Sequence, residues 1–123
     1  MTIMEAINRI DSLKPNTYSQ VEKIRVLSTL DGIIKEKIID THEGAEAVVF
    51  EGYAEETNLT TNLLVPAPYD EIYLYWLESK INYWNGETGK FNNSIAMYNA
   101  AYTEFESHYN RTHMPKGKKF KFF

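Results

Sequence analysis

The stretch around His42 is the first place where this sequence could bind a metal. His42-Glu43 matches the first two residues of the helical zinc motif of metalloproteases, in which a second histidine follows one turn later. Glu46 occupies that second position here, so two imidazoles cannot reach a metal from one face. His108 and His113 are five residues apart, which puts them on different faces of a helix, and we expect both to be exposed. The sequence therefore predicts no metal site.

The stretch Gly86-Glu87-Thr88-Gly89-Lys90 contains the glycines and the lysine of a phosphate-binding loop. A true loop of that kind has its glycines further apart and follows the lysine with a Ser or Thr that binds magnesium. Phe91 follows here, so a turn between two helices is the better interpretation. No serine lies in a nucleophile elbow, and the absence of cysteine excludes disulfides and a cysteine nucleophile. We predict a non-enzymatic protein with no catalytic residues and no cofactor.

Charge is distributed unevenly along the 123 residues. Nine of the 13 basic residues and all 17 acidic residues precede Lys116, so residues 1–115 carry a net charge of −8 and the last eight residues carry +4. An acidic body argues against a dedicated reader of duplex DNA, which presents a basic face. No apolar run approaches the roughly 20 residues of a bilayer span, and no secretory signal is evident. We expect synthesis in the cytoplasm and no membrane association.

The N-terminal third predicts two amphipathic helices. Thr2 with Glu5, and Ser19 with Glu22, have the spacing of a capping box at a helix start. Apolar residues follow each start at intervals of three and four, namely Ile3, Ile7 and Ile10 in the first helix and Ile24, Leu27, Leu30, Ile34 and Ile38 in the second. Pro15 ends the first helix, and the second ends near Thr41. Gly32 inside the second predicts a close contact or a local bend.

Residues 42–68 have a different character. Two short apolar runs, at residues 48–50 and 63–65, could form strands, but about a dozen polar residues separate them, too many for a tight hairpin. A long excursion of this kind is typical of a binding loop or an arm that contacts a partner. The alternative is a loop that caps the helices with Phe50, Tyr53 and Leu64. Both interpretations remain open at this stage.

Two aromatic-rich helices are predicted after Pro68. The first has an inner stripe of Tyr73, Leu77, Ile81 and Trp84, with Leu74, Trp76 and Tyr83 on a second apolar surface, and ends at Gly86. The second has a heptad-like seam of Phe91, Ile95, Tyr98, Tyr102, Phe105 and Tyr109 and ends before Pro115. The predicted fold is mainly α. It is a four-to-five-helix bundle over residues 1–115, with a long irregular or short-β segment, residues 42–68, between the second and third helices.

The last eight residues, 116–123, are called the tail below, and they alternate lysines with phenylalanines. One interpretation is a peptide arm that docks on an acidic neighbouring surface and buries its rings. A second is phosphate binding combined with base stacking, and a third is a disordered solubilising tail. Clustered exposed rings favour association, which supports the first. The protein-interface candidates are Tyr73, Trp76, Tyr83, Tyr102, Tyr109, Lys118, Lys119, Phe120, Phe122 and Phe123.

Four strings resemble small proteins of long-tailed phages and prophages of low-GC Gram-positive bacteria, and the similarity covers most of the chain from about Ser19 onward. They are Leu63-Leu64-Val65-Pro66-Ala67-Pro68-Tyr69-Asp70-Glu71-Ile72-Tyr73, Tyr83-Trp84-Asn85-Gly86-Glu87, Phe91-Asn92-Asn93-Ser94 and Tyr109-Asn110-Arg111-Thr112-His113-Met114-Pro115. The order of helices is similar to that of the head–tail connector (adaptor) superfamily. Aromatic richness and the long 42–68 segment depart from that pattern.

This resemblance implies a helical subunit that forms a homo-oligomeric ring on the portal and extends the DNA channel towards neck and tail proteins. It implies no catalytic residues, location in the host cytoplasm during assembly and then in the virion, and duplex DNA that passes without specific recognition. Head-to-tail contacts in a ring need two different adhesive surfaces, and the second apolar faces of the second and third helices are candidates. The alternative function is a small phage regulatory or host-interaction protein that binds one protein partner through its aromatic fourth helix.

Overall fold

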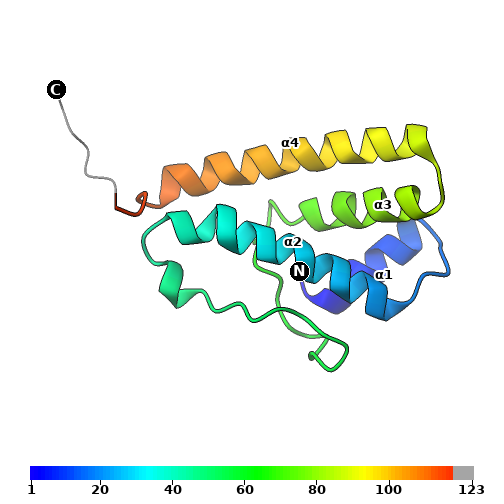
Figure 1. Ribbon diagram of the computed structural model, residues 1–123, viewed down its shortest axis with the longest axis horizontal. Coiled ribbons are helices and arrows are strands. Elements are labelled where there is room, and N and C mark those ends of the chain that lie inside the picture. Colours follow the sequence, from blue (N-terminus) through cyan, green and yellow to red (C-terminus); the bar gives the residue numbers. More distant parts are fainter. Residues whose placement is uncertain (118–123) are drawn as a thin grey trace.

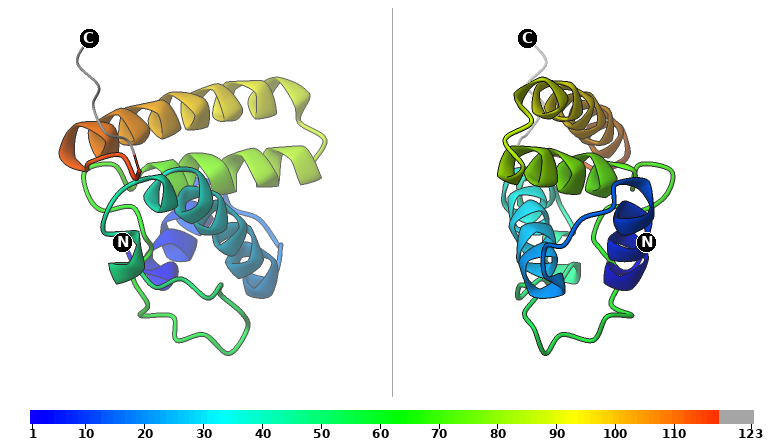
Figure 2. Two further views of the ribbon diagram at one scale, coloured as in Figure 1. Left: turned by 60° about the vertical axis from the view of Figure 1, so that its left-hand side comes forward. Right: turned by 90° about the vertical axis from the view of Figure 1, so that its right-hand side faces the viewer.

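The computed structural model describes residues 1–117, which form four α-helices and two short 3-10 helices. In chain order these are α1 (Ile3–Leu13), α2 (Gln20–Lys37), η1 (Ile39–Thr41), η2 (Ala45–Ala47), α3 (Ile72–Trp84) and α4 (Thr88–Thr112). The antiparallel pair of α3 and α4 forms one layer, and α1 and α2 form the layer beneath it (Figures 1 and 2). The predicted mainly α class is therefore confirmed.

The helix starts follow the predicted capping chemistry. Thr2 Oγ1 accepts a hydrogen bond from Glu5 N at 3.1 Å, and Glu5 Oε1 accepts one from Thr2 N at 3.2 Å, so the capping box of α1 is complete. At α2, Ser19 Oγ accepts from Glu22 N at 3.2 Å. These bonds satisfy backbone donors that a first helical turn otherwise leaves without partners. The sequence therefore sets both starts locally.

The central helix of the bundle is α3, which packs against α1, α2 and α4. Its buried residues lie all around its circumference for that reason. They are Ile72, Tyr73, Leu74, Trp76, Leu77, Ser79, Ile81 and Asn82. A helix covered on several sides needs apolar residues on more than one face. The second apolar surface of α3, a candidate for ring contacts, is thus largely covered within the subunit at Leu74 and Trp76, while Tyr83 stays exposed.

The segment from η1 to the start of α3 passes under the bundle and returns to the N-terminus of α1 (Figures 1 and 2). Its only regular elements within residues 1–117 are η1 and η2, so the runs at residues 48–50 and 63–65, which could have formed strands, do not form them. Val49 is 76% exposed and enters no ladder. An isolated antiparallel β-bridge joins Asn62 to Thr2. Backbone N–H groups at residues 64 and 65 bond to side chains instead of to a second strand.

The chain after α4 is fixed at its start to the end of α2. Pro115 bridges to His42, and Lys116 N donates to Thr41 O at 2.8 Å. Five of the predicted interface residues (Lys118, Lys119, Phe120, Phe122 and Phe123) lie outside the described residues. Within residues 1–117, the helices lack the combination of length and apolar character needed to cross a bilayer.

Candidate functional site

The aromatic interface candidates within residues 1–117 divide into buried and exposed members. Tyr73 is 0% exposed, and Trp76 and Tyr109 are also buried, so none of the three presents a ring to a partner. Tyr73 and Trp76 lie on α3, and Tyr109 packs against His42 near the end of α4, so each ring stabilises the subunit itself. Their assignment as interface residues is therefore corrected. Tyr102 is half-buried, and Tyr83 is 67% exposed.

A buried acidic group, Asp31 on α2, organises the middle of the molecule. Its Oδ1 accepts a 2.5 Å hydrogen bond from the Tyr73 hydroxyl. Its Oδ2 accepts one from the Tyr53 hydroxyl at 2.5 Å and one from Leu64 N at 3.0 Å. The Tyr73 hydroxyl in turn accepts from Val65 N at 2.7 Å. Through these bonds the Asp31 carboxyl group connects α2 to α3 and to two parts of the long connection, at Tyr53 and at Leu64.

The protonation chemistry of this cluster follows from its burial. Burial raises the pKa of the Asp31 carboxyl, and the hydrogen bonds from Tyr53, Tyr73 and Leu64 N partly oppose that rise. Burial and the neighbouring Asp31 charge raise the pKa of the Tyr73 and Tyr53 hydroxyls above the ordinary value. Both phenols therefore keep their protons and act as donors. Asp31 is fully buried, and both of its carboxyl oxygens accept hydrogen bonds from other parts of the chain, so the cluster stabilises the fold.

A second polar cluster surrounds His42, which is buried at the junction of η1 and the end of α4. Its Nδ1 donates to Ile38 O at 2.6 Å, and its Nε2 lies 2.8 Å from Asn110 Oδ1. The ring packs edge-on against Tyr109 with centroids 4.9 Å apart. His113 stacks on the same Tyr109 ring at 3.7 Å. This cluster attaches the end of α4 to the end of α2.

The predicted turn between α3 and α4 is confirmed, and Gly86 ends α3 with a φ of 73°. An ion pair joins this turn to Lys14, the residue at the C-terminal end of α1. Glu87 lies 2.8 Å from Lys90 Nζ and 3.3 Å from Lys14 Nζ, and Asn85 Nδ2 donates to Glu87 Oε1 at 2.9 Å. Hydrogen bonds from Lys90, Asn85 and Lys14 lower the pKa of Glu87 to about 2. The Glu87 charge is therefore matched by nearby cations.

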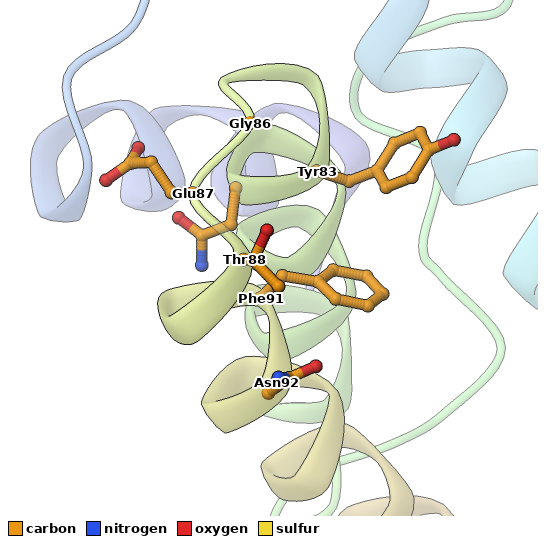
Figure 3. A pocket seen from close by; sticks show the side chains of 7 residues that line it. Tyr83, Gly86, Glu87, Thr88, Phe91 and Asn92 are labelled. Atoms are coloured by element: carbon orange, nitrogen blue, oxygen red, sulfur yellow. The ribbon is translucent and has the colours of Figure 1, made fainter.

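A pocket of about 370 Å³ opens at the same turn. Tyr83 and Phe91 line it with rings whose centroids lie 5.8 Å apart, and Figure 3 shows both rings on one side of the turn and Glu87 on the other. Asn82, at the end of α3, also lines it. The Asn82 side chain is fully buried and donates from Nδ2 to Ser94 Oγ at 3.1 Å, but Oδ1 has no hydrogen-bond partner within residues 1–117.

Such an acceptor carries a free-energy cost of about 1–3 kcal/mol when it is left unsatisfied. Because Asn82 is 0% exposed, its Oδ1 is not on the pocket surface, and the groups that the pocket offers to a ligand are the rings of Tyr83 and Phe91. The pocket is therefore the candidate site, and its lining suits an aromatic or apolar group. No catalytic step follows from these groups.

Comparison with known proteins adds no relative to this picture. No protein family, curated protein or solved structure matches the chain. In the part of the chain that the structure describes, three or more His, Asp or Glu residues do not gather into a candidate metal site. The function is therefore argued from the site itself.

Sequence reasoning missed the burial and the structural role of Asp31, His42 and Asn82. A signal existed for Asp31, because it interrupts an apolar stripe at a position between Leu27 and Ile34 that faces the core. An acidic residue at such a position needs hydrogen-bond donors from elsewhere in the chain. His42 and Asn82 gave no comparable signal, because their partners come from α4. His113 is exposed as expected, whereas His108 is half-buried against Tyr69.

Proposed function

We propose that this protein is a virion morphogenesis protein, a head–tail connector that assembles as a homo-oligomeric ring on the portal and links the head to neck and tail proteins. Duplex DNA would pass through the ring without specific recognition. The protein would act in the host cytoplasm during assembly and then remain in the virion. Its role would be non-enzymatic, with adhesion supplied by defined surface sites.

The observation that carries this proposal is the placement of two different adhesive features at opposite ends of α4. The pocket of Tyr83 and Phe91 lies at the N-terminal end. The basic, aromatic tail follows the C-terminal end. Two unlike surfaces are what a head-to-tail ring requires of each subunit. The acidic character of residues 1–115 also supports a channel role, because like charge repels phosphates and keeps duplex DNA from adhering.

The resemblance to phage proteins supplies the second line of support; its four strings lie between Leu63 and Pro115. They bear on biological context, whereas the pocket and the tail bear on mechanism. The two lines are independent, because the resemblance depends on sequence strings and the pocket depends on the packing of α3 against α4.

Deletion of the gene from a phage or an inducible prophage tests the proposal. We expect DNA-filled heads without attached tails, restored to tailed particles by the wild-type gene supplied in trans. Mass spectrometry of purified wild-type virions should detect the protein in a fixed ratio to the portal protein. Tailed, DNA-filled particles from the deletion strain would contradict the proposal, as would its absence from mature virions.

The alternative, a regulatory or host-interaction protein that binds a partner through α4, makes a different demand on the structure. It needs the aromatic seam of α4 to be free, yet Tyr98, Phe105 and Tyr109 are buried against the rest of the bundle. The same virion measurement separates the two functions, because a connector remains in mature particles and a regulator does not. No observation on residues 1–117 favours the alternative.

A further inference from the structure

The pocket at the α3–α4 turn is apolar and open to solvent. Its rings, Tyr83 and Phe91, belong to different parts of the helical hairpin, on α3 and α4. An apolar cavity of about 150 Å³ accommodates one benzene ring, so the volume of about 370 Å³ suffices for a phenylalanine side chain and its flanking backbone.

We propose that this pocket binds the tail of a second copy of the chain, so that each subunit is joined head-to-tail to the next. This inference rests on the proposed function, because it supplies the subunit contact that a ring requires. The tail offers three phenylalanines, Phe120, Phe122 and Phe123, and intervening lysines. A phenylalanine ring would lie beside Tyr83 and Phe91.

Charge favours a second copy as the source of the tail. The tail carries +4, and residues 1–115 carry −8. A cationic peptide is attracted to such a body at long range, and the attraction raises the rate of encounter. At short range the Glu87 charge is already matched by Lys14 and Lys90, so the pocket selects for rings instead of for charge alone.

Distance excludes a chain from filling its own pocket. Helix α4 has 25 residues, which corresponds to a length of about 37 Å at 1.5 Å per residue. Lys116 is held at the C-terminal end of α4 by the bond to Thr41 O. The pocket residues belong to the α3–α4 turn, and that turn lies at the opposite end of α4 (Figure 1). From Gly117 to Phe123 an extended chain covers at most about 22 Å. The contact is therefore between molecules.

A contact between two different surfaces repeats from one copy to the next. Such a heterologous contact closes into a ring when the rotation between copies allows it and otherwise gives an open filament. The turn that carries the pocket is tied to α1 through Lys14 and Glu87. Docking at that turn would therefore fix the orientation of a neighbour relative to the whole bundle and not to a loose loop.

Disulfide trapping between full-length chains tests the proposal, because the chain has no cysteine of its own. One copy carries Thr88→Cys, at an exposed position that lines the pocket. The other carries Lys121→Cys, which leaves all three tail phenylalanines in place. The two are mixed in a glutathione redox buffer and the cross-linked heterodimer is quantified. The matched control replaces Thr88→Cys with Ser107→Cys, which is equally exposed but lies towards the other end of α4.

We expect about tenfold more heterodimer from the pocket pair than from the control pair, because a bound tail raises the local concentration of its cysteine. Equal yields from the two pairs would overturn the proposal. A chain carrying both Thr88→Cys and Lys121→Cys should cross-link only between molecules. A monomeric disulfide as its main product would overturn the proposal in the same way.

A second variant pair tests the pocket rings directly. Tyr83→Ala in the Thr88→Cys chain should lower the heterodimer yield about tenfold, as expected for an aromatic anchor. Met97→Ala, which removes another exposed apolar side chain of this layer outside the pocket, should leave the yield unchanged. Tyr83 is largely exposed, so thermal melting should show both variants folded. An unchanged yield with Tyr83→Ala would overturn the proposal.

The outcome is separable from that of the gene deletion. If trapping succeeds and the deletion strain still makes tailed particles, self-association through the tail stands and the connector function fails. If the deletion removes tails and trapping fails, the connector function stands and this docking mode is wrong.

Discussion

The hydroxyl of Tyr73 donates a 2.5 Å hydrogen bond to Oδ1 of Asp31, from a position 42 residues further along the chain. The same hydroxyl accepts from Val65 N at 2.7 Å. One phenol thus satisfies a buried acidic group and a buried backbone donor, and it joins α3 to α2 and to the long connection. A ring that the sequence suggested for a partner is instead a central contact within the subunit.

Replacing Tyr73 with phenylalanine tests that relationship. Tyr73→Phe leaves Val65 N and one Asp31 oxygen without partners in the core, and we expect the free energy of unfolding to fall by about 2–4 kcal/mol. Tyr53→Phe is the matched control, because Tyr53 also donates to Asp31 but is only partly buried. Water can replace its hydroxyl, so about 1 kcal/mol is expected there. Urea unfolding of both variants measures the difference, and equal losses would contradict the prediction.

The raised pKa of Asp31 gives a stability effect of defined sign. The folded-state pKa lies above the ordinary value of 3.8, so the folded protein binds more protons than the unfolded chain between the two pKa values. The stability contributed by this group is fully present below pH 3.8 and is lost as pH rises through the folded-state pKa.

Asp31→Asn removes this titration, so the difference in unfolding free energy between the wild type and the variant should fall as pH rises above 4. Its slope is at most about 1.4 kcal/mol per pH unit for one proton. Urea unfolding of both proteins from pH 3.5 to 7 provides the two curves. Because other carboxyls titrate alike in both proteins, they cancel in the difference. A difference that is flat over this range, or that rises with pH, would refute the prediction.

Gly32 offers a route to higher stability. It lies inside α2, and a Cβ atom there would meet the Phe50 ring at 3.7 Å, an ordinary van der Waals distance. Gly32→Ala should therefore raise the free energy of unfolding by up to about 1 kcal/mol, through the better helix propensity of alanine. Gly52→Ala is the control, because the φ of Gly52 is +88°, and alanine in that conformation costs about 1–2 kcal/mol. Thermal melting should show opposite shifts, and a lower melting temperature for Gly32→Ala would disprove the first.

Two residues of the α4 seam are buried to different extents, so truncating them should lower the free energy of unfolding by different amounts. Phe105 is 2% exposed, and Phe105→Ala should cost about 3–5 kcal/mol as a large truncation in a core. Tyr102 lies one turn earlier on the same seam but is only half-buried, so Tyr102→Ala should cost about half as much or less. Chemical denaturation of the two variants measures both values. A larger loss for Tyr102→Ala than for Phe105→Ala would show that the burial of the seam has been assigned wrongly.

Much of the fold was predictable because its signals are local. The capping residues Thr2 and Ser19, the turn at Gly86 and the spacing of Ile24, Leu27 and Leu30 each depend on residues within one or two turns. The run at residues 63–65, which could have been a strand, is not one for a reason that is not local. The N–H groups at positions 64 and 65 bond to Asp31 and Tyr73, and nothing near them in the sequence announces those partners.

The candidate site shows the same division. The sequence identified Tyr83 as an apolar residue on a second surface, and that surface is exposed at this residue alone among Leu74, Trp76 and Tyr83. It could not identify Asn82 as a buried acceptor, because the burial comes from α4 folding back over α3. Pocket volume and a missing hydrogen-bond partner are properties of packed helices.

The sequence by itself determined the four helices, the starts of α1 and α2, and the contrast between an acidic body and a basic, aromatic tail. These follow from periodicity, capping and charge, all of which depend on near neighbours in the chain. Only the tertiary structure decided which aromatic rings are buried and which remain available. Burial depends on what packs against each face of a helix. Tyr73 and Tyr83 lie ten residues apart on α3, yet the first is buried and the second is exposed.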